Sequence, residues 1–244
     1  MSEPDSKRSG LTRRDALRAG AATAGGLAFA GGLLGPALEV AASPAVVGAG
    51  PYGPIQGPDA NGMLLPAGFS SRIVARTDQE IGPRPYKFHV LPDGMGSFKT
   101  DDGGFILVSN SEAPYIRDLL DIGAAALRFD RNFNITDAYP ILKNTMVNCA
   151  GGVTPWGTWL SCEEIEGGKV FECDPYGKKA AVARPAMGVF KHEACAVDPV
   201  GKHVYLTEDL GDGCLYRFTP DRYPDLSSGL LEVAKVADDG HVSW

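Results

Sequence analysis

The sequence predicts an all-β fold made of a repeated unit, and three observations support this prediction. Short runs of β-branched and aromatic residues recur along the chain, and turns rich in Gly, Pro and Asp bound each run. Helix signals are few. A unit of about 45 residues repeats, which is the length expected for one blade of a β-propeller. The expected strand runs are residues 105–109, 125–129, 170–173, 204–207 and 214–218.

The first 42 residues read as an export signal rather than as part of the fold. Arg13 and Arg14 form a twin arginine, and an apolar stretch rich in Ala and Gly follows at residues 19–38. Small residues at 40–42 offer a cleavage site, so residues 1–42 are typical of a twin-arginine (Tat) signal peptide. The alternative is an uncleaved membrane anchor, because the apolar stretch has about 20 residues. We therefore expect export by the Tat translocase to the periplasm, the cell surface or the outside of a bacterium.

The net charge of the chain limits its partners. All 244 residues together carry a formal charge of −7, and residues 1–42 contribute a net +1, which leaves −8 for the remainder. A chain this acidic has no electrostatic reason to bind nucleic acid, whereas it can hold cations. The roughly 200 remaining residues suffice for one domain with a hydrophobic core.

Two further segments are expected after the signal. Residues 43–66 are rich in Gly and Pro and show no period, which is typical of an arm or a linker. Residues 67–244 are expected to form a partial β-propeller with about three blades and the beginning of another. The chain stops at Trp244 in what reads as the middle of a strand, so we expect this sequence to be a fragment of a longer propeller.

The repeat places metal-ligand residue types at matching positions. Cys149 precedes Glu164 by 15 residues, and Glu193 precedes Glu208 by the same offset. Glu112 ends a strand run in a third copy of the unit, as Glu164 and Glu208 do in theirs. Equivalent positions on repeated strands converge near the axis of a propeller. We therefore expect these five residues to meet in one metal site.

The residue types in this set limit which metals fit. Carboxylates suit hard cations such as Ca²⁺ and Fe³⁺, and a single thiolate among them favours a transition metal such as iron. Without cations the carboxylates would repel one another, so the cluster requires either bound metals or side chains that diverge. A solvated strand end is the simpler interpretation of each glutamate taken alone. Asn148 and His192 adjoin Cys149 and Glu193 and are expected to hydrogen-bond to ligands or substrate, or, for His192, to cap a loop.

The five cysteines leave at least one thiol unpaired. Cys149 lies in a Gly-rich stretch and is the candidate for the unpaired one. Cys162 and Cys173 lie on successive strand runs, where they are either neighbours that pair or two small buried hydrophobic residues, the interpretation we favour. The pairing of Cys195 and Cys214 stays open.

Residues 148–164, NCAGGVTPWGTWLSCEE, resemble the PhoX family of bacterial alkaline phosphatases. Residues 190–194 and 205–209 resemble further motifs of that family, and the resemblance runs from the twin-arginine signal to the last residue. It implies a monomeric, Tat-exported propeller of about six blades that holds iron and calcium and cleaves phosphate esters. It also implies that Cys149 binds iron and that Glu164 and Glu193 hold iron and calcium. Glu208 is carried over from a shorter motif, and Glu112 follows from the repeat.

The sequence therefore favours an exported phosphatase that acts on small-molecule phosphate monoesters, with no catalytic residue assigned. The alternatives are a non-catalytic, calcium-stabilised propeller that serves as a binding or scaffold module, and a propeller lactonase with one hard cation and no thiolate ligand. This chain departs from the family in length, because the later blades would supply further carboxylates and a phosphate-binding arginine. We expect weak or no activity from this chain alone.

Overall fold

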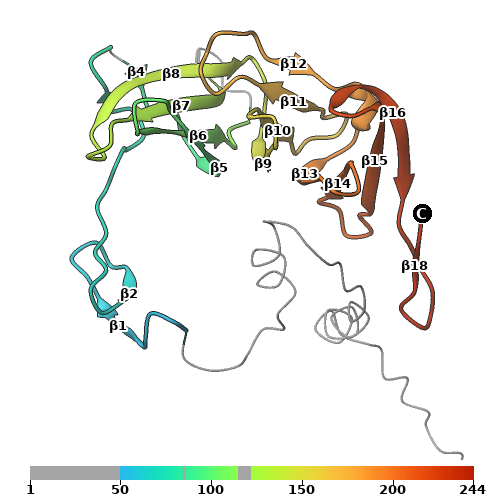
Figure 1. The fold of residues 1–244 in the computed structure, drawn as a ribbon, viewed down its shortest axis with the longest axis horizontal. Coiled ribbons are helices and arrows are strands. Elements are labelled where there is room, and N and C mark those ends of the chain that lie inside the picture. Colours follow the sequence, from blue (N-terminus) through green and yellow to red (C-terminus); the bar gives the residue numbers. More distant parts are fainter. Residues whose placement is uncertain (1–49, 85, 115–121) are drawn as a thin grey trace, which may run out of the picture. The chain divides into compact units, whose positions relative to one another are not determined.

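The computed structural model describes residues 50–84, 86–114 and 122–244 (Figure 1). The expected signal peptide lies outside the described residues. Within the described residues, no helix is long and apolar enough to cross a membrane. The chain divides into two units, one with the described residues up to Arg72 together with Val236–Ser243, and the other with Ile73–Lys235 and Trp244.

The described part of the expected arm contains a short hairpin rather than an extended chain. Strand β1 (Ile55–Pro58) pairs with β2 (Leu64–Pro66). The side chain of Asp59 accepts hydrogen bonds from the backbone N–H groups of Asn61 and Met63, which stabilises the turn between the strands. The side chains of β1 are exposed, so this hairpin contributes little hydrophobic burial.

The larger unit is all-β, as predicted. It consists mainly of three four-stranded antiparallel sheets, and within each sheet the strands lie in sequence order. A single 3-10 turn, η1 (Pro185–Met187), and a small hairpin of β3 (Glu80–Ile81) and β4 (Tyr86–Lys87) accompany them in the described residues. Sheet 1 holds β5 (Pro92–Lys99), β6 (Phe105–Ser111), β7 (Gly123–Phe129) and β8 (Ile135–Lys143); sheet 2 holds β9 (Asn148–Val153), β10 (Trp159–Glu163), β11 (Val170–Cys173) and β12 (Val182–Ala183); sheet 3 holds β13 (His192–Asp198), β14 (His203–Glu208), β15 (Leu215–Arg222) and β16 (Asp225–Val233). A last short hairpin pairs β17 (Lys235–Val236) with β18 (Val242–Ser243).

The strand runs expected from the sequence fall on β6, β7, β11, β14 and β15. Each of these strands lies inside its sheet and has buried side chains. Buried interior strands are rich in apolar residues, which is the pattern that predicted them from the sequence. The interpretation of the three sheets as blades of a propeller stays a prediction.

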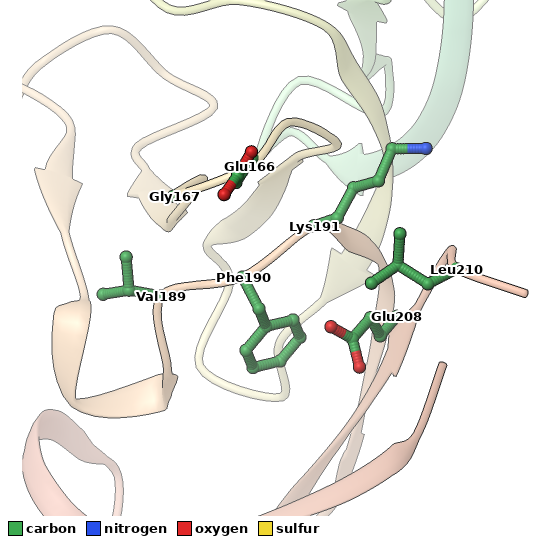
Figure 2. A pocket seen from close by; sticks show the side chains of 7 residues that line it. All are labelled: Glu166, Gly167, Val189, Phe190, Lys191, Glu208 and Leu210. Carbon is green, nitrogen blue, oxygen red and sulfur yellow. The ribbon is translucent and has the colours of Figure 1, made fainter. Parts of the chain in front are cut away.

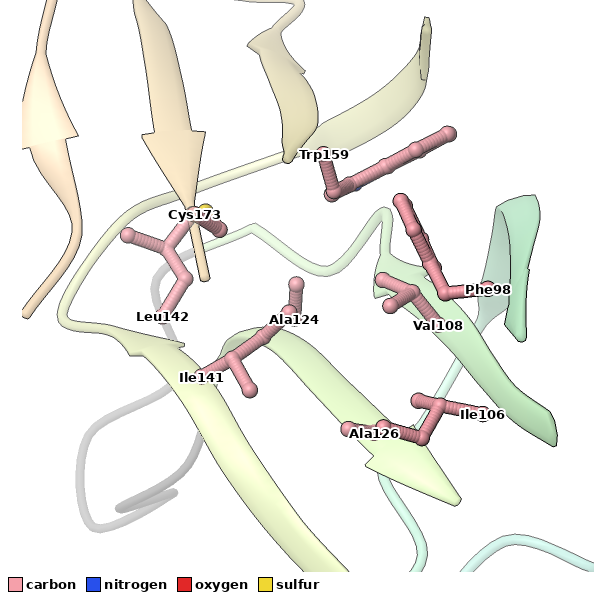
Figure 3. Packing of buried hydrophobic residues seen from close by; sticks show 9 residues of the cluster. All are labelled: Phe98, Ile106, Val108, Ala124, Ala126, Ile141, Leu142, Trp159 and Cys173. Carbon is pink, nitrogen blue, oxygen red and sulfur yellow. The ribbon is translucent and has the colours of Figure 1, made fainter. Parts of the chain in front are cut away.

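Two hydrophobic clusters hold the three sheets against one another. Figure 3 shows the first, in which Phe98 and Val108 of sheet 1 pack against Trp159 of sheet 2. The second joins sheets 2 and 3 through Leu160 and Leu206, together with other buried side chains. Because residues 159 and 160 are consecutive on β10, they point to opposite faces, so each face of sheet 2 is buried against one neighbour.

Three of the cysteines, Cys162, Cys173 and Cys195, pack as small hydrophobic residues in the two clusters. All five are free thiols. Cys173 lies opposite Trp159 and belongs to the cluster between sheets 1 and 2, whereas Cys162 lies three residues further along β10 and belongs to the cluster between sheets 2 and 3. The odd separation puts the two thiols on opposite faces of the sheet. A Cys162–Cys173 pair is therefore wrong.

The first strands of the sheets lie side by side, since β9 contacts both β5 and β13 (Figure 1). Two glycines allow this approach. A Cβ added at Gly94 would lie 2.6 Å from the Cα of Ala150, and one at Gly152 would lie 2.4 Å from the carbonyl oxygen of Cys195. Both distances are far shorter than carbon contacts allow. Glycine is therefore required where one backbone passes directly against the next.

Candidate metal centre

The same β-bulge recurs in the first strand of all three sheets. In each sheet, three steps along the first strand oppose two steps along the second, so the first strand carries one extra residue. The pairs that bound the bulges are Pro92↔Ser111 and Met95↔Ser109 in sheet 1, Asn148↔Glu163 and Gly151↔Ser161 in sheet 2, and His192↔Glu208 and Cys195↔Leu206 in sheet 3. Bulges redirect side chains, so a repeated bulge redirects the same position three times.

Asp93, Cys149 and Glu193 are the first residues inside these bulges, and the structure brings them together. The thiol of Cys149 lies 3.1 Å from Oδ2 of Asp93 and 3.3 Å from Oε1 of Glu193, and donates toward both carboxylates. Each of the three sheets thus contributes one side chain to a common point.

Asp93 is a site residue that the sequence analysis missed. Glu112 follows Asp93 by 19 residues, whereas Glu164 follows Cys149 by 15, because the β5–β6 hairpin is longer than the β9–β10 hairpin. A search at one fixed offset therefore passes over Asp93. The signal that identifies Asp93 is a carboxylate at the start of β5, the bulged strand of sheet 1.

A second set of equivalent residues follows the second strand of each sheet. The N–H groups of Glu112, Glu164 and Asp209 donate to the carbonyls of Leu91, Val147 and Lys191, at 2.9, 2.8 and 3.2 Å. The equal 15-residue offsets within the sequence predicted Glu208 at this position. The β13–β14 hairpin is one residue longer than β9–β10, so the register assigns the position to Asp209 instead.

Glu208 is the equivalent of Glu163, and both carboxylates hold the turn that follows their strand. Glu163 accepts a hydrogen bond from the N–H of Lys169 at 3.2 Å, and Glu208 accepts one from the N–H of Cys214 at 3.2 Å. Glu208 also accepts from the hydroxyl of Tyr216 at 2.9 Å. Glu208 belongs to neither of the ligand groups found in the part of the chain that the structure describes.

Two groups of ligand atoms form around Cys149. One consists of Asp93, Glu112 and Cys149, and the other of Cys149, Glu164 and Glu193, and within each group all ligand atoms lie within 4.8 Å of one another. The structure therefore brings together Cys149, Glu112, Glu164 and Glu193, as expected, and adds Asp93. Cys149 belongs to both groups, so its sulfur is the ligand atom that the two groups have in common.

The electrostatics of the cluster fit bound cations. Burial raises the pKa of the Cys149 thiol, and the hydrogen bonds to Asp93 and Glu193 raise it further. Burial also raises the pKa of Glu112, with added effects from the charges of Asp93, Glu164 and Glu193. Without a cation, Cys149 and Glu112 therefore favour their protonated, neutral forms. One thiol and four carboxylates are a donor set for hard cations together with a transition metal, and a cation would stabilise the thiolate.

Asn110 positions Cys149 and was also missed in the sequence analysis. Its fully buried amide donates to the carbonyls of Cys149 and Ala150, at 2.9 Å each. Its Oδ1 accepts from the indole of Trp159 and the hydroxyl of Ser161, both at 2.9 Å. Every hydrogen-bonding group of this side chain is thus used to hold β9 and β10 of sheet 2 against sheet 1. A run of three polar residues, 109–111, at the end of an apolar strand was the available signal.

Asn148 and His192 are buried beside the centre, and their hydrogen bonds go elsewhere. Asn148 donates to Ser161 Oγ at 2.9 Å and accepts from Thr145 Oγ1 at 2.6 Å. The Nε2 atom of His192 lies 3.2 Å from the carbonyl of Gly188, which agrees with the loop-capping alternative. Burial lowers the pKa of His192 to about 4, so the ring is neutral near pH 7.

The backbone is strained next to the centre. Leu91 and Val147 precede the bulges of sheets 1 and 2 and have φ angles of 45° and 46°. This left-handed region is rare for side chains other than Gly, Asn and Asp, and rarest for a β-branched residue such as Val147. The carbonyls of both residues accept the hydrogen bonds from Glu112 and Glu164. The surrounding hydrogen bonds therefore hold the strained turns in place.

Replacing Gly94 by alanine is expected to separate β5 from β9 and to disrupt the centre. The added methyl would collide with the backbone of Ala150, so Asp93 would move away from Cys149. We expect a loss of about 1–3 kcal/mol in the free energy of unfolding and a loss of bound metal, measured by urea unfolding and by elemental analysis. Gly211→Ala is the control, because its methyl would meet open space. Unchanged metal content in Gly94→Ala would contradict the proposed role of this close approach.

The chain matches the sequence model of a protein family. The sequence model of a family described as alkaline phosphatase PhoX matches residues 120–169 and 165–244, a region that includes Cys149, Glu164 and Glu193. No curated protein and no solved structure matches the chain.

Proposed function

This chain belongs to the PhoX family of alkaline phosphatases, and from this membership we propose that it is an exported, metal-dependent phosphatase of phosphate monoesters. The observation that carries the proposal is the meeting of one thiol and four carboxylates from three sheets around a common point. A centre of this composition suits iron together with calcium, the thiolate favouring iron and the carboxylates suiting both.

The proposal includes a propeller architecture. Three sequential four-stranded sheets with neighbouring first strands and the same bulge in each support the interpretation as blades. The twin arginine in residues 1–42 supports export by Tat, which carries folded proteins and so suits a centre that is loaded before export. The native protein is proposed to act as a monomer in the periplasm, at the cell surface or outside the cell.

The described residues hold and orient the centre. Asp93, Glu112, Glu164 and Glu193 would bind the ions with oxygen, and Cys149 with sulfur. Bound ions would supply positive charge to the phosphoryl oxygens and stabilise the charge that develops there during hydrolysis. Asn110 and the repeated bulges fix the direction of the ligands, and the packing of Trp159 and Phe98 keeps the underlying strands rigid.

The test is a metal analysis together with a phosphatase assay on the full-length protein. Iron and calcium are measured by elemental analysis, and hydrolysis is followed with p-nitrophenyl phosphate and, for comparison, with the diester bis(p-nitrophenyl) phosphate. Bound iron and calcium with hydrolysis of the monoester are the expected results. Calcium alone, without hydrolysis, would instead support the non-catalytic binding module. Absence of both metals would contradict the proposal.

A further inference from the structure

Lys191 is a basic residue beside the candidate centre, at a position where the other two sheets carry apolar residues. The equivalent positions in sheets 1 and 2 are Leu91 and Val147, whose carbonyls accept the same backbone hydrogen bond. The ammonium of Lys191 lies 2.8 Å from Oε1 of Glu164 and 3.2 Å from Oδ2 of Asp209. A basic side chain thus contacts a carboxylate that also belongs to the ligand group of Cys149.

The contact with Glu164 leaves Lys191 available to a substrate. The side chain of Lys191 is 30% exposed, whereas that of Glu164 is 11% exposed, so the ammonium is the more accessible member of the pair. A cation bound at the centre would compete with Lys191 for the same carboxylate. The ammonium would then retain donors for another acceptor, and a phosphoryl oxygen is an acceptor that lysine commonly binds.

A cavity lies beside Lys191. It has a volume of about 300 Å³, and Lys191, Phe190, Val189, Leu210, Glu166 and Glu208 are among the residues that line it. Figure 2 shows the ammonium of Lys191 pointing away from the ring of Phe190. Lys191 therefore borders the cavity with its side chain and reaches the centre with its charged end.

One wall of the cavity is held rigid by ring stacking. The centroid of the Phe190 ring lies 3.7 Å from the ring centroid of His192 and 4.4 Å from that of Tyr216. The hydroxyl of Tyr216 donates to Glu208 at 2.9 Å, which fixes a second lining residue. A wall that is already ordered costs little entropy when a ligand binds.

The lining selects the kind of group that fits. Val189, Phe190 and Leu210 offer apolar surface, and the volume is at the small end of the range for ligand pockets, roughly 300–1,000 Å³. Glu166 and Glu208 add negative charge to the same lining. A compact apolar or aromatic group would gain from burial here, whereas a second phosphate would be repelled.

We propose that Lys191 and this cavity form the substrate subsite, in which the ammonium binds a phosphoryl oxygen and the cavity receives the organic group of the ester. The favoured substrates are monoesters in which a single phosphate is attached to a compact apolar or aromatic group. This inference rests on the proposed phosphatase function and extends it to the choice of substrate.

The experiment measures the binding of two phosphonates, which are not hydrolysed, to the metal-loaded full-length protein by isothermal titration calorimetry. Phenylphosphonate is expected to bind several-fold more tightly than methylphosphonate, because its ring is buried in the cavity. Lys191→Met should weaken both ligands by roughly 10-fold or more, since a charge-assisted hydrogen bond is lost. Lys191→Arg keeps the positive charge and should retain most of the wild-type affinity for both phosphonates. Leu210→Ser should weaken phenylphosphonate by about 3-fold and leave methylphosphonate unchanged.

Lys179→Met is the matched control, because Lys179 is an exposed lysine in the loop before β12 and should affect neither ligand. Equal binding of both phosphonates by the wild type, or unchanged binding in Lys191→Met, would overturn the subsite. Loss of metal in Lys191→Met would assign this residue a structural role and would also overturn it. If the wild type holds metal and hydrolyses monoesters in any of these cases, only the subsite fails. If it does neither, the proposed function itself fails.

Discussion

Cys149→Ser is expected to remove most of the iron from the loaded protein and to abolish most of its phosphatase activity. Cys149 belongs to both ligand groups, so its replacement affects every ion that the cluster would hold. Outer partners of a ligand already contribute 10–100-fold to metal affinity, so a shared ligand should contribute more than about 100-fold. The β-sheet signal in circular dichroism should be retained, because serine has nearly the shape of cysteine and the strand is held through its backbone by Asn110.

The control for this substitution is Cys214→Ser. Cys214 is a partly exposed thiol that belongs to neither ligand group; its backbone N–H donates to Glu208, and its sulfur lies 4.0 Å from the carbonyl oxygen of Asp212. Its replacement should leave iron, calcium and activity near the wild-type level. Iron content and activity that survive in Cys149→Ser would contradict the metal centre.

Glu112→Gln is expected to act in opposite directions with and without metal. Without metal, burial and the charges of Asp93, Glu164 and Glu193 raise the pKa of Glu112, so the folded state favours the protonated form. The contribution of Glu112 to the free energy of unfolding is therefore fully present at pH values below the ordinary pKa of glutamate, about 4.3. This contribution is lost as the pH rises through the raised pKa of Glu112 in the folded state. Glutamine does not ionise, so the variant should be more stable than the wild type at pH 7 without metal.

With metal bound, the sign should reverse, because the ionised carboxylate of Glu112 then faces a cation. A ligand at 100–1,000 times its dissociation constant stabilises a protein by about 3–4 kcal/mol, and Glu112→Gln should lose part of this gain. Urea unfolding between pH 5 and 8, with and without a chelator, measures both effects. Glu166→Gln is the control, since this exposed glutamate belongs to neither ligand group. A change of the same sign under both conditions would show that Glu112 does not face a cation.

The strands were predictable because their signals are local. Apolar and aromatic residues recur at strand spacing in β6, β11 and β14, and Gly, Pro and Asp end each run, so sequence neighbours alone identify them. The disulfide alternative was not decided at this level, since Cys162 and Cys173 lie on paired strands but face opposite clusters. That outcome depends on the pairing register, which arises from contacts between segments.

The sequence by itself determined the all-β class and the repeated unit, and it identified Cys149, Glu112, Glu164 and Glu193 as residues that meet. Only the tertiary structure decided which residues hold the corresponding positions in the other two sheets. Asp209 rather than Glu208 occupies the position in sheet 3 that is equivalent to Glu164, and Asp93 joins the cluster from the longer hairpin of sheet 1. The reason is that a shift of one residue turns a strand side chain to the other face, and hairpin length and bulges set that shift.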